Sequence, residues 1–406
     1  MPEVPSSPLL PTAAPTAADY GGFVYWPDNL AWSNQLMRLI GYASVGAADF
    51  SEVYFVARSL PVGDEEAWQS GFSGLAAQLD EQATKAASDG HAVTAREKWL
   101  RASTYYRFAG QLSALAGVSV PHVEDSRRCF RAATAGGVHS AEPVDVPFQG
   151  EALAGYLVRT AGNDQPAPAV IVSGGIDAFA EEMYPKIGAA LARRGYTALL
   201  LDGPGQGESA RRGISGRYKY ESACSAAFDF LTSRAAVDST RIAVLGASLG
   251  GYYATRAAAY EHRLAACVIW GATGNFYADV GAHLTPDSPL TAQLGQAEAY
   301  FGVTGLDSVK RALADMSLDG IPELIRCPTL ILHGEKDIQI PVAAAHWTFD
   351  HIVHAPKQLL VIPGGAPGAT HCQLDSPVVA QHAICDFLDH VLHTHAAETM
   401  RGGSLC

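Results

Sequence analysis

The sequence Gly-Ala-Ser-Leu-Gly at residues 246–250 places Ser248 between two glycines. An apolar run of strand length, residues 242–245, precedes it, and an alanine-rich segment of helical length follows. This context is typical of a nucleophile elbow, a strained strand-to-helix turn whose neighbours two residues away must be small. Such a turn projects the Ser248 hydroxyl above a sheet and leaves the Leu249 N–H free to stabilise an oxyanion. We therefore predict that Ser248 is a catalytic nucleophile and that Leu249 is an oxyanion-hole donor.

A serine hydroxyl is a poor nucleophile until a base takes its proton. In enzymes with a nucleophile elbow, an acid and then a histidine follow the serine along the chain. Asp337 lies just after the apolar run 329–332, with Glu335 as a rival acid. His371 lies in a glycine-rich segment after the last apolar run, residues 358–362. We predict that Asp337 and His371 complete a catalytic triad with Ser248.

The second oxyanion donor is expected in the loop after the first parallel strand, where two glycines let the backbone approach a substrate closely. We predict that the N–H of Gly175 or Ile176 fills this role. Asp177 follows directly, although an ordinary esterase needs no acid there. It is either a general acid/base or substrate anchor, or the N-cap of a helix that carries Glu181 and Glu182 in its first turns.

The glycine-rich segment 201–213 has the composition of a phosphate loop. It lacks the Lys and Ser/Thr of a P-loop, and its glycine spacing differs from G-x-G-x-x-G. We interpret it as a tight turn held by Asp202. His, Asp and Glu show no spacing suited to a metal, so we predict neither a metal nor a cofactor.

Periodicity divides the chain into two kinds of structure. Residues 28–118 are helix-like, with Ala95, Trp99, Ala102, Tyr106 and Ala109 on one predicted helical face. From residue 136 a predicted hairpin is followed by alternating strand-like and helix-like segments, which indicates a parallel sheet covered by helices on both faces. The predicted strands are residues 144–148, 153–159, 169–173, 197–201, 242–245, 266–270, 329–332 and 358–362.

These patterns predict an α/β-hydrolase fold with a mostly parallel sheet, preceded by a helical module. The expected organisation is a disordered leader at 1–19, the N-terminal helical module at 20–135, a first part of the core at 136–272, a helical lid insertion at 273–320, a second part of the core at 321–398 and a flexible tail at 399–406.

The amino-acid composition limits the classes of function that the chain can have. The chain of 406 residues is 48% hydrophobic and 17% charged, so it can bury a sizeable core. Its net charge of −13 and scattered arginines argue against a nucleic-acid partner. The seven cysteines form no C-x-x-C pair, and no run is long and apolar enough to span a membrane. We expect a cytoplasmic enzyme, with no membrane partner, that acts on a small molecule.

The order of several short motifs in the sequence resembles that of a known family. Ser-Gly-Gly-Ile-Asp at 173–177, Leu-Asp-Gly-Pro-Gly-Gln-Gly-Glu-Ser at 201–209, the elbow, Leu-His-Gly-Glu-Lys-Asp at 332–337 and His371-Cys372 occur in this order. Over about residues 90–395 the chain is similar to the 2,6-dihydropseudooxynicotine hydrolase group, which is related to the fermentation-respiration switch protein and to fungal polyketide-shortening hydrolases.

The resemblance implies cleavage of a carbon–carbon bond next to a ketone, in a 1,3-diketone or polyketide-like substrate. It implies that the helical module caps the active site, that the protein is a homodimer and that Ser248, Asp337 and His371 form the triad. The Asp177 position matches a catalytic glutamate of one group member. Tyr105, Tyr106 and Arg107 resemble a cap motif and either contact substrate or pack the cap against the core.

Three other functions remain open. The same triad would serve a plain esterase or thioesterase, and an acyltransferase or cyclase that releases a biosynthetic polyketide intermediate. A non-catalytic binding protein that keeps the fold is a further alternative, against which the complete set of Ser248, Asp337 and His371 argues.

Overall fold

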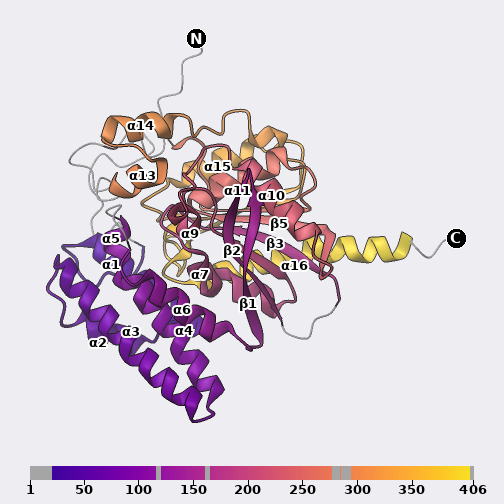
Figure 1. Cartoon of the computed structure of the whole chain (residues 1–406). Helices are drawn as coiled ribbons and strands as arrows, with labels where there is room; N and C mark the ends of the chain where they lie inside the picture. Colours follow the sequence, from indigo (N-terminus) through magenta and orange to yellow (C-terminus); the bar gives the residue numbers. More distant parts are fainter. Residues whose placement is uncertain (1–20, 116–119, 161–164, 277–283, 285–293, 403–406) are drawn as a thin grey trace.

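The computed structural model describes residues 21–115, 120–160, 165–276, 284 and 294–402, with only the backbone for 393–402. The predicted leader at 1–19 lies outside the described residues, as do parts of the 273–320 insertion and the end of the tail. Figure 1 shows the described chain as a helical N-terminal part beside a larger sheet-containing part.

The central layer is an eight-stranded sheet in the order β1-β2-β4-β3-β5-β6-β7-β8. Neighbouring strands run parallel along the series from β4 to β8, whereas β2 pairs antiparallel with both β1 and β4. The predicted α/β fold with a mostly parallel sheet is confirmed. The strands are β1 His139–Phe148, β2 Glu151–Thr160, β3 Ala167–Ser173, β4 Thr197–Leu201, β5 Val237–Ala247, β6 Ala266–Trp270, β7 Thr329–Gly334 and β8 Lys357–Ile362.

The predicted hairpin is formed by β1 and β2, joined by a two-residue turn at Gln149 and Gly150. Both turn residues have positive φ, 52° and 86°, as the hairpin turn that matches strand twist requires. Pro147 is accommodated because β1 is the edge strand and needs no hydrogen-bond donor on its outer side.

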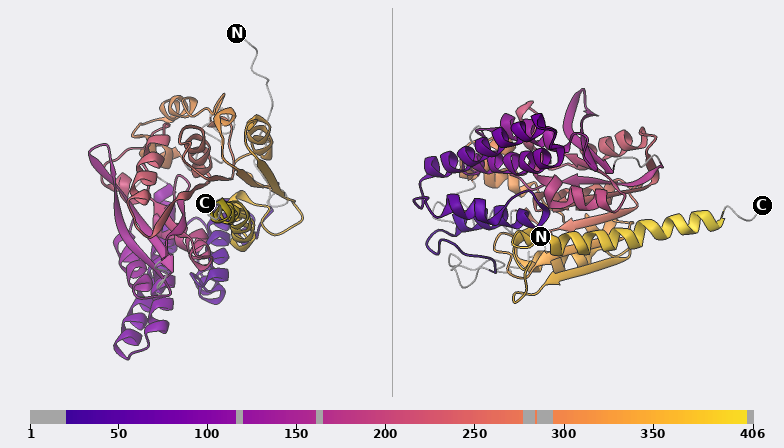
Figure 2. Two further views of the ribbon diagram at one scale, coloured as in Figure 1. Left: turned by 90° about the vertical axis from the view of Figure 1, so that its right-hand side faces the viewer. Right: turned by 90° about the horizontal axis from the view of Figure 1, so that it is seen from below.

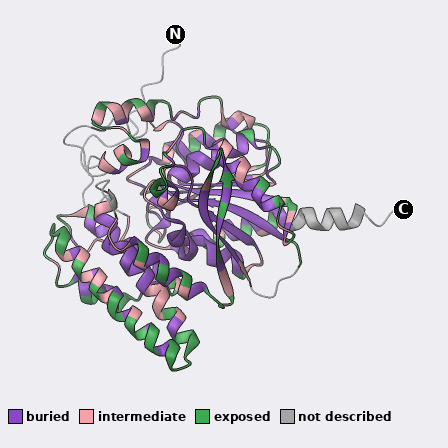
Figure 3. Ribbon diagram, in the orientation of Figure 1, coloured by how far each residue is buried: buried purple, intermediate pink, exposed green. Residues whose placement is uncertain are grey.

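Helices cover both faces of the sheet, which explains why the inner strands are apolar throughout. Ile171 of β3 packs into one layer, and its neighbours Val170 and Val172 pack into the other. The first layer contains α10 Glu221–Thr232, α11 Leu249–Tyr260 and α15 Val342–His351, and the second contains α8 Ala189–Arg193 and α16 Pro377–Gly402. Figure 3 shows the inner strands as buried, whereas the edge strand β1 carries several exposed residues.

The crossover after β3 departs from the single helix that residues 183–195 suggest. It consists of α7 Ala180–Met183, a π-helical turn η2 Tyr184–Gly188, and α8. Pro185 lacks the N–H that an α-helical hydrogen bond requires, and this loss locally favours the wider turn. The turn brings Lys186 to the inner side of the crossover, where its side chain is buried.

The N-terminal module has its own aromatic core. Trp32 and Trp68 meet edge to face at 5.1 Å, and Asp64 caps α3 by accepting from the Ala67 N–H at 2.9 Å. Phe130 of α6 packs on Tyr156 of β2, ring centroids 4.9 Å apart, and so fixes the module against the sheet. Its elements are α1 Leu30–Gly41, η1 Tyr42–Val45, α2 Phe50–Ala57, α3 Glu65–Ser88, α4 Ala92–Ala109, α5 Gln111–Leu115 and α6 Val123–Thr134.

The expected helical face on α4 is found, because Ala95, Ala102, Tyr106 and Ala109 are buried. The two views of Figure 2 place the module along one end of the sheet, and its residues Arg38 and Arg107 contact the loop that follows β3.

The remaining elements lie in segments that follow or precede strands. The described part of the 273–320 insertion includes α13 Leu294–Phe301 and α14 Leu306–Ala314, and the short elements α9 Gly207–Arg211, η5 Pro322–Leu324 and η6 His371–Gln373 lie in loops. Of these, α9, α13, α14 and η6 follow strands, whereas η5 leads into β7. None of the described helices combines the length and apolarity needed to cross a lipid bilayer.

Candidate active site

Ser248 stands at the turn between β5 and α11, with φ 59° and ψ −120°. A non-glycine residue pays about 1–3 kcal/mol for such a conformation. The turn is tight because Gly246 and Gly250 nearly touch: a Cβ on Gly246 would lie 1.7 Å from the Gly250 carbonyl oxygen. A Cβ on Gly250 would lie 2.4 Å from the Ser173 carbonyl oxygen of β3. The structure thus has the geometry of the predicted elbow.

The three predicted triad residues meet although they are far apart in sequence. His371 Nε2 lies 2.9 Å from the Ser248 Oγ, and His371 Nδ1 lies 2.6 Å from the Asp337 Oδ2. The other carboxylate oxygen of Asp337 accepts the N–H groups of Gln339 and Ile340 at 2.8 and 2.9 Å. These two backbone bonds fix the carboxylate, which in turn orients the imidazole toward the serine.

Electrostatics within the pair favour an ionised acid beside a basic imidazole. Burial alone would raise the pKa of Asp337, but His371 lowers it below its usual range. Burial alone would lower the pKa of His371, but the Asp337 carboxylate and Cys372 raise it above the ordinary histidine value. A more basic imidazole accepts the serine proton more readily.

The rival acid, Glu335, lies on the surface of the protein. Its side chain is exposed and accepts a hydrogen bond from the Gly364 N–H. It caps a loop on the surface and does not reach His371 in this arrangement, so the geometry favours Asp337 over Glu335.

The predicted oxyanion donors face the serine. Leu249 is the first residue of α11, so its N–H has no acceptor within the helix. A Cβ on Gly175 would lie 3.5 Å from the Ser248 Oγ, which places the Gly175 backbone directly beside the hydroxyl. Ile176 lines the same pocket. These backbone groups can surround an oxygen that becomes negative during attack.

The loop that carries Gly175 is held from outside by Gln206, which the sequence analysis did not single out. The Gln206 Nε2 donates to the carbonyl oxygens of Gly174 and Gly175, both at 2.8 Å. Both carbonyl oxygens are held by hydrogen bonds, so the N–H groups of Gly175 and Ile176, which share the same two peptide planes, keep their orientation. The Gln206 side chain is fully enclosed, with 2% of the residue exposed.

Asp202 holds the turn that contains Gln206, as predicted. Its carboxylate accepts the N–H groups of Ala180 and Glu208, both at 2.8 Å. Burial and the nearby Glu181 raise the pKa of Asp202 to about 7. The segment 201–213 therefore forms a hydrogen-bonded turn behind the oxyanion loop.

Three side chains of the N-terminal module hold Asp177 at the edge of the pocket. Arg38 Nη1 and Gln111 Nε2 donate to its Oδ2 at 2.5 and 2.8 Å, and Arg107 Nη2 donates to its carbonyl oxygen at 2.6 Å. Burial would raise the pKa of Asp177, but Arg38 and Arg107 hold it below its usual range. Asp177 does not cap α7, because the residue in the N-cap position is Phe179. An ionised carboxylate in this setting is a poor proton donor.

A second carboxylate completes this cluster. Glu182 accepts from Arg38 Nε at 2.6 Å and from the Tyr42 hydroxyl at 2.7 Å, and Arg107 Nη2 lies 3.8 Å away. Two arginines of the module therefore face two carboxylates of the sheet-containing part. Sequence analysis missed Arg38 because it occupies an otherwise ordinary amphipathic helix, with no motif around it.

The three residues of the suggested cap motif have different environments. Tyr105 donates to Glu52 Oε2 at 2.7 Å and accepts from the Asp49 N–H, and it is buried inside the module. Tyr106 stacks on His122 at 5.7 Å. Both tyrosines thus pack within the module, and neither is among the described residues that line the pocket of Ser248. Arg107 reaches the back of the oxyanion loop and links the module to it.

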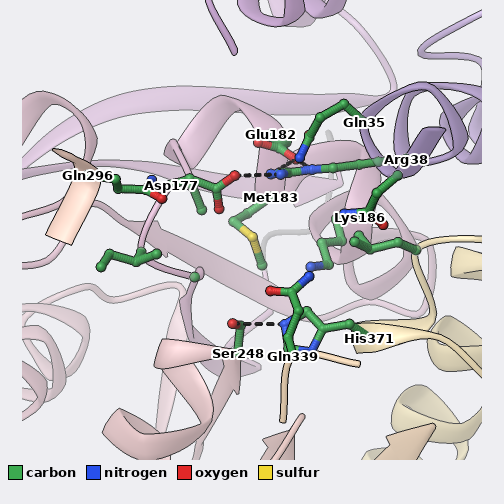
Figure 4. A pocket seen from close by; sticks show the side chains of 15 residues that line it. Gln35, Arg38, Asp177, Glu182, Met183, Lys186, Ser248, Gln296, Gln339 and His371 are labelled. Atoms are coloured by element: carbon green, nitrogen blue, oxygen red, sulfur yellow. Dashed lines mark hydrogen bonds and ion pairs between the residues drawn. The ribbon is translucent and has the colours of Figure 1, made fainter. Parts of the chain in front are cut away.

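Ser248, His371 and the Arg38–Asp177 ion pair line one pocket, whose open space is about 570 Å³ including its mouth. Figure 4 shows Ser248 and His371 on one side, with the Arg38–Asp177 ion pair across from them. The lining residues that the sequence did not indicate come from several elements: Asn34, Gln35 and Arg38 from α1, Glu182 and Met183 from α7, Lys186 from η2, Gln296 from α13, and Ala178, Gln339 and Leu374 from loops. Within the described residues, no group of three or more His, Cys, Asp or Glu side chains could hold a metal ion.

Comparisons with known families agree with this architecture. A family model described as "Esterase FrsA-like" matches residues 68–280, just over half of the chain. A model of the prolyl oligopeptidase family matches residues 186–394.

Similar curated proteins are fungal hydrolases. Hydrolase ORFZ of Pyricularia oryzae is 29% identical over 402 residues, covering 87% of this chain and 94% of that protein. Hydrolyase poxO of Penicillium oxalicum is 27% identical over 369 residues, covering 79% and 86%. Among solved structures, a 2,6-dihydroxy-pseudo-oxynicotine hydrolase has a TM-score of 0.73 at 26% identity and covers 87% of this chain and 95% of its own.

Proposed function

Because the chain belongs to the FrsA-like esterase family of α/β hydrolases, we propose that it hydrolyses a carbon–carbon bond next to a ketone in a 1,3-diketone or polyketide-like substrate. The observation that carries this proposal is the hydrogen-bonded series Asp337–His371–Ser248, which opens into a pocket under a helical cap. The family resemblance drawn from the sequence is confirmed. The similarity to a 2,6-dihydroxy-pseudo-oxynicotine hydrolase supports the proposed substrate class, and the similarity to fungal hydrolases supports a hydrolase activity.

In the proposed mechanism His371 takes the Ser248 proton while the serine oxygen attacks one ketone carbon. The negative oxygen that forms is stabilised by the Leu249 N–H and by the N–H of Gly175 or Ile176. Collapse of this intermediate breaks the carbon–carbon bond and leaves an acyl group on Ser248. The electron pair of the broken bond becomes an enolate, because a second carbonyl is conjugated to the departing carbon.

The proton for the departing carbon comes from His371, which received it from Ser248. Asp177 is the less suitable donor, since Arg38 and Gln111 keep it as a carboxylate. Its proposed role is to anchor the cap and the oxyanion loop. Water, deprotonated by His371, then hydrolyses the acyl-enzyme and releases a carboxylic acid.

A second candidate function uses the same triad on an ester or thioester, or transfers the acyl group to an internal nucleophile of a polyketide-type intermediate. The family model's description as an esterase favours this alternative. Hydrolysis of an ester or thioester differs from the proposed reaction in the leaving group only, so one experiment separates these two functions.

That experiment compares two substrates with the same benzoyl group, 1-phenyl-1,3-butanedione and p-nitrophenyl benzoate, by their kcat/KM values. The proposal expects turnover of the diketone that disappears in Ser248→Ala. Turnover of the ester with an untouched diketone would replace the proposal by the esterase function. Labelling of Ser248 by a fluorophosphonate, absent in Ser248→Ala, excludes a binding protein without a working nucleophile.

We also propose that the protein is a homodimer, as the family resemblance implies. Three aromatic residues on α2, Phe50, Tyr54 and Phe55, are 46–63% exposed and support a subunit contact there. Light scattering should give the mass of two chains for the wild type and of one chain for Phe55→Glu. A single-chain mass for the wild type would contradict the dimer.

A further inference from the structure

Lys186 is a buried cation inside the active-site pocket. Only 7% of the residue is exposed, and it lines the same pocket as Ser248 and His371. Among the residues that the structure describes, none forms a hydrogen bond or an ion pair with its Nζ. An ammonium group removed from water without a carboxylate partner is costly, so proteins rarely keep one without a use for it.

The neighbouring charges do not neutralise Lys186. Arg38 and Arg107 are matched by Asp177 and Glu182, which they contact directly. Arg38, Arg107 and Lys186 carry three positive charges against two negative charges on Asp177 and Glu182, and Lys186 is the cation of this cluster that contacts neither carboxylate. Burial is the main reason that the pKa of Lys186 is lowered, and an anionic ligand would offset the loss of hydration.

The fold places Lys186 in the pocket that contains the nucleophile. Its Nζ lies 4.7 Å from the centre of the Trp270 ring, and the Trp270 carbonyl oxygen accepts the Ser248 N–H at 2.8 Å. The side chain extends from the π-helical turn η2, a type of irregularity that recurs at functional sites. Figure 4 shows Lys186 between the Arg38–Asp177 ion pair and His371.

We propose that Lys186 is the catalytic cation that binds the second carbonyl oxygen of a 1,3-dicarbonyl substrate and stabilises it as it becomes an enolate. The inference rests on the proposed function and names the group that makes the carbon leaving group acceptable. The amides of Leu249 and of Gly175 or Ile176 serve the carbonyl that Ser248 attacks. Lys186 serves the other carbonyl, which gains charge only when the carbon–carbon bond breaks.

The step balances without any further reactant. The electron pair of the broken bond moves onto the second carbonyl oxygen, where the Lys186 N–H groups donate hydrogen bonds to it. The departing carbon takes the proton that His371 carried from Ser248, and the enolate becomes a neutral ketone. Lys186 keeps all its protons, so its role is electrostatic.

The kinetic test compares Lys186→Met with the matched control Lys85→Met, which changes a lysine whose side chain is 75% exposed. The readout is the ratio of kcat/KM for 1-phenyl-1,3-butanedione to that for p-nitrophenyl benzoate, which lacks a second carbonyl. Removal of one donor to a developing oxyanion typically costs about 10²–10³-fold in rate. We expect the ratio to fall about 100-fold in Lys186→Met and to stay unchanged in Lys85→Met.

An unchanged ratio in Lys186→Met would overturn the inference while leaving the proposed function intact. No diketone turnover by the wild type would instead contradict the proposed function itself. If Lys186→Met fails to fold, seen as loss of fluorophosphonate labelling, Lys186→Leu, which also lacks a donor, takes its place with the same expectation.

A binding measurement tests Lys186 without turnover. The Ser248→Ala protein should bind 1-phenyl-1,3-butanedione as its enolate, which absorbs at longer wavelength than the neutral enol, at a pH where the free compound is neutral. The same protein with Lys186→Met should bind it without the enolate band. A neutral spectrum in Ser248→Ala, or an enolate band that persists without Lys186, would contradict the assignment.

Discussion

Arg38 of helix α1 donates a 2.5 Å hydrogen bond to Asp177, two residues after the glycine that faces the nucleophile. The N-terminal module is therefore not a detached cover. It is joined through buried charges to the loop that supplies an oxyanion donor, so docking of the module and the geometry of the oxyanion hole depend on each other.

This relationship predicts how Asp177→Asn behaves. The amide removes the charge that Arg38 faces, and loss of one partner of a buried pair destabilises by roughly 3 kcal/mol. Since Asp177 anchors the loop, we expect kcat/KM for the diketone and for the ester to fall by similar factors. A fall at least tenfold larger for the diketone would show that Asp177 acts on the leaving group. Arg128→Met, which removes an exposed ion pair with Asp80, is the stability control and should cost about 0–1 kcal/mol.

Gln206→Leu tests the support behind the oxyanion loop. Leucine fills a similar volume but cannot donate to the carbonyl oxygens of Gly174 and Gly175. A small displacement of a catalytic group can cost on the order of 10²-fold in rate. We expect kcat to fall by about this factor on both substrates with little change in KM. A wild-type kcat would mean that the loop keeps its position without Gln206.

The pH dependence follows from the coupling of His371 to Asp337. The imidazole must be unprotonated to accept the Ser248 proton, so kcat/KM rises with pH through the pKa of His371. Because Asp337 raises that pKa, the midpoint should lie above the ordinary histidine value of about 6.5. The Asp337→Asn variant lacks the negative charge that raises the pKa of His371, so the midpoint of its pH profile should move to lower pH. Its activity should fall about 10⁴-fold. An unshifted midpoint in the variant would contradict the assigned pairing.

The strained conformation of Ser248 predicts opposite effects on stability and activity. With φ at 59°, glycine adopts this backbone conformation more easily than serine or alanine does. Ser248→Gly should therefore unfold with a free energy about 1–2 kcal/mol higher than Ser248→Ala, while both lack hydrolase activity. Equal denaturant midpoints for the two variants would argue that the elbow is not strained.

The sequence predicted the parts of the site that depend on local patterns. The elbow needs Gly246 and Gly250 for steric reasons, and the strand before it is apolar because both its faces are buried, so each leaves a signature in the chain. Asp337 and His371 follow strands and could be located by their order. The hairpin turn at Gln149 and Gly150 was likewise visible in the residue types.

The rest of the pocket depends on contacts between distant segments. Arg38 lies 139 residues from Asp177, and nothing near either residue marks the pair. Lys186 lies in a π-helical turn, whose wider winding shifts side chains away from the positions of an α-helix, and α-helical periodicity does not predict that shift. Tyr105 and Tyr106 matched a family motif, yet their neighbours assign them to packing, since a motif does not distinguish core from pocket.

Isotope-resolved product analysis tests the central claim most directly. The protein is incubated with 1-phenyl-1,3-butanedione in ¹⁸O-labelled water, and the products are identified by mass spectrometry with Ser248→Ala as the control. Hydrolysis through a Ser248 acyl-enzyme predicts benzoic acid and acetone in equal amounts, or acetic acid and acetophenone if the other carbonyl is attacked. The label should enter the acid at the carboxyl group, and no products should form in Ser248→Ala. An intact diketone alongside serine-dependent ester hydrolysis would contradict carbon–carbon cleavage.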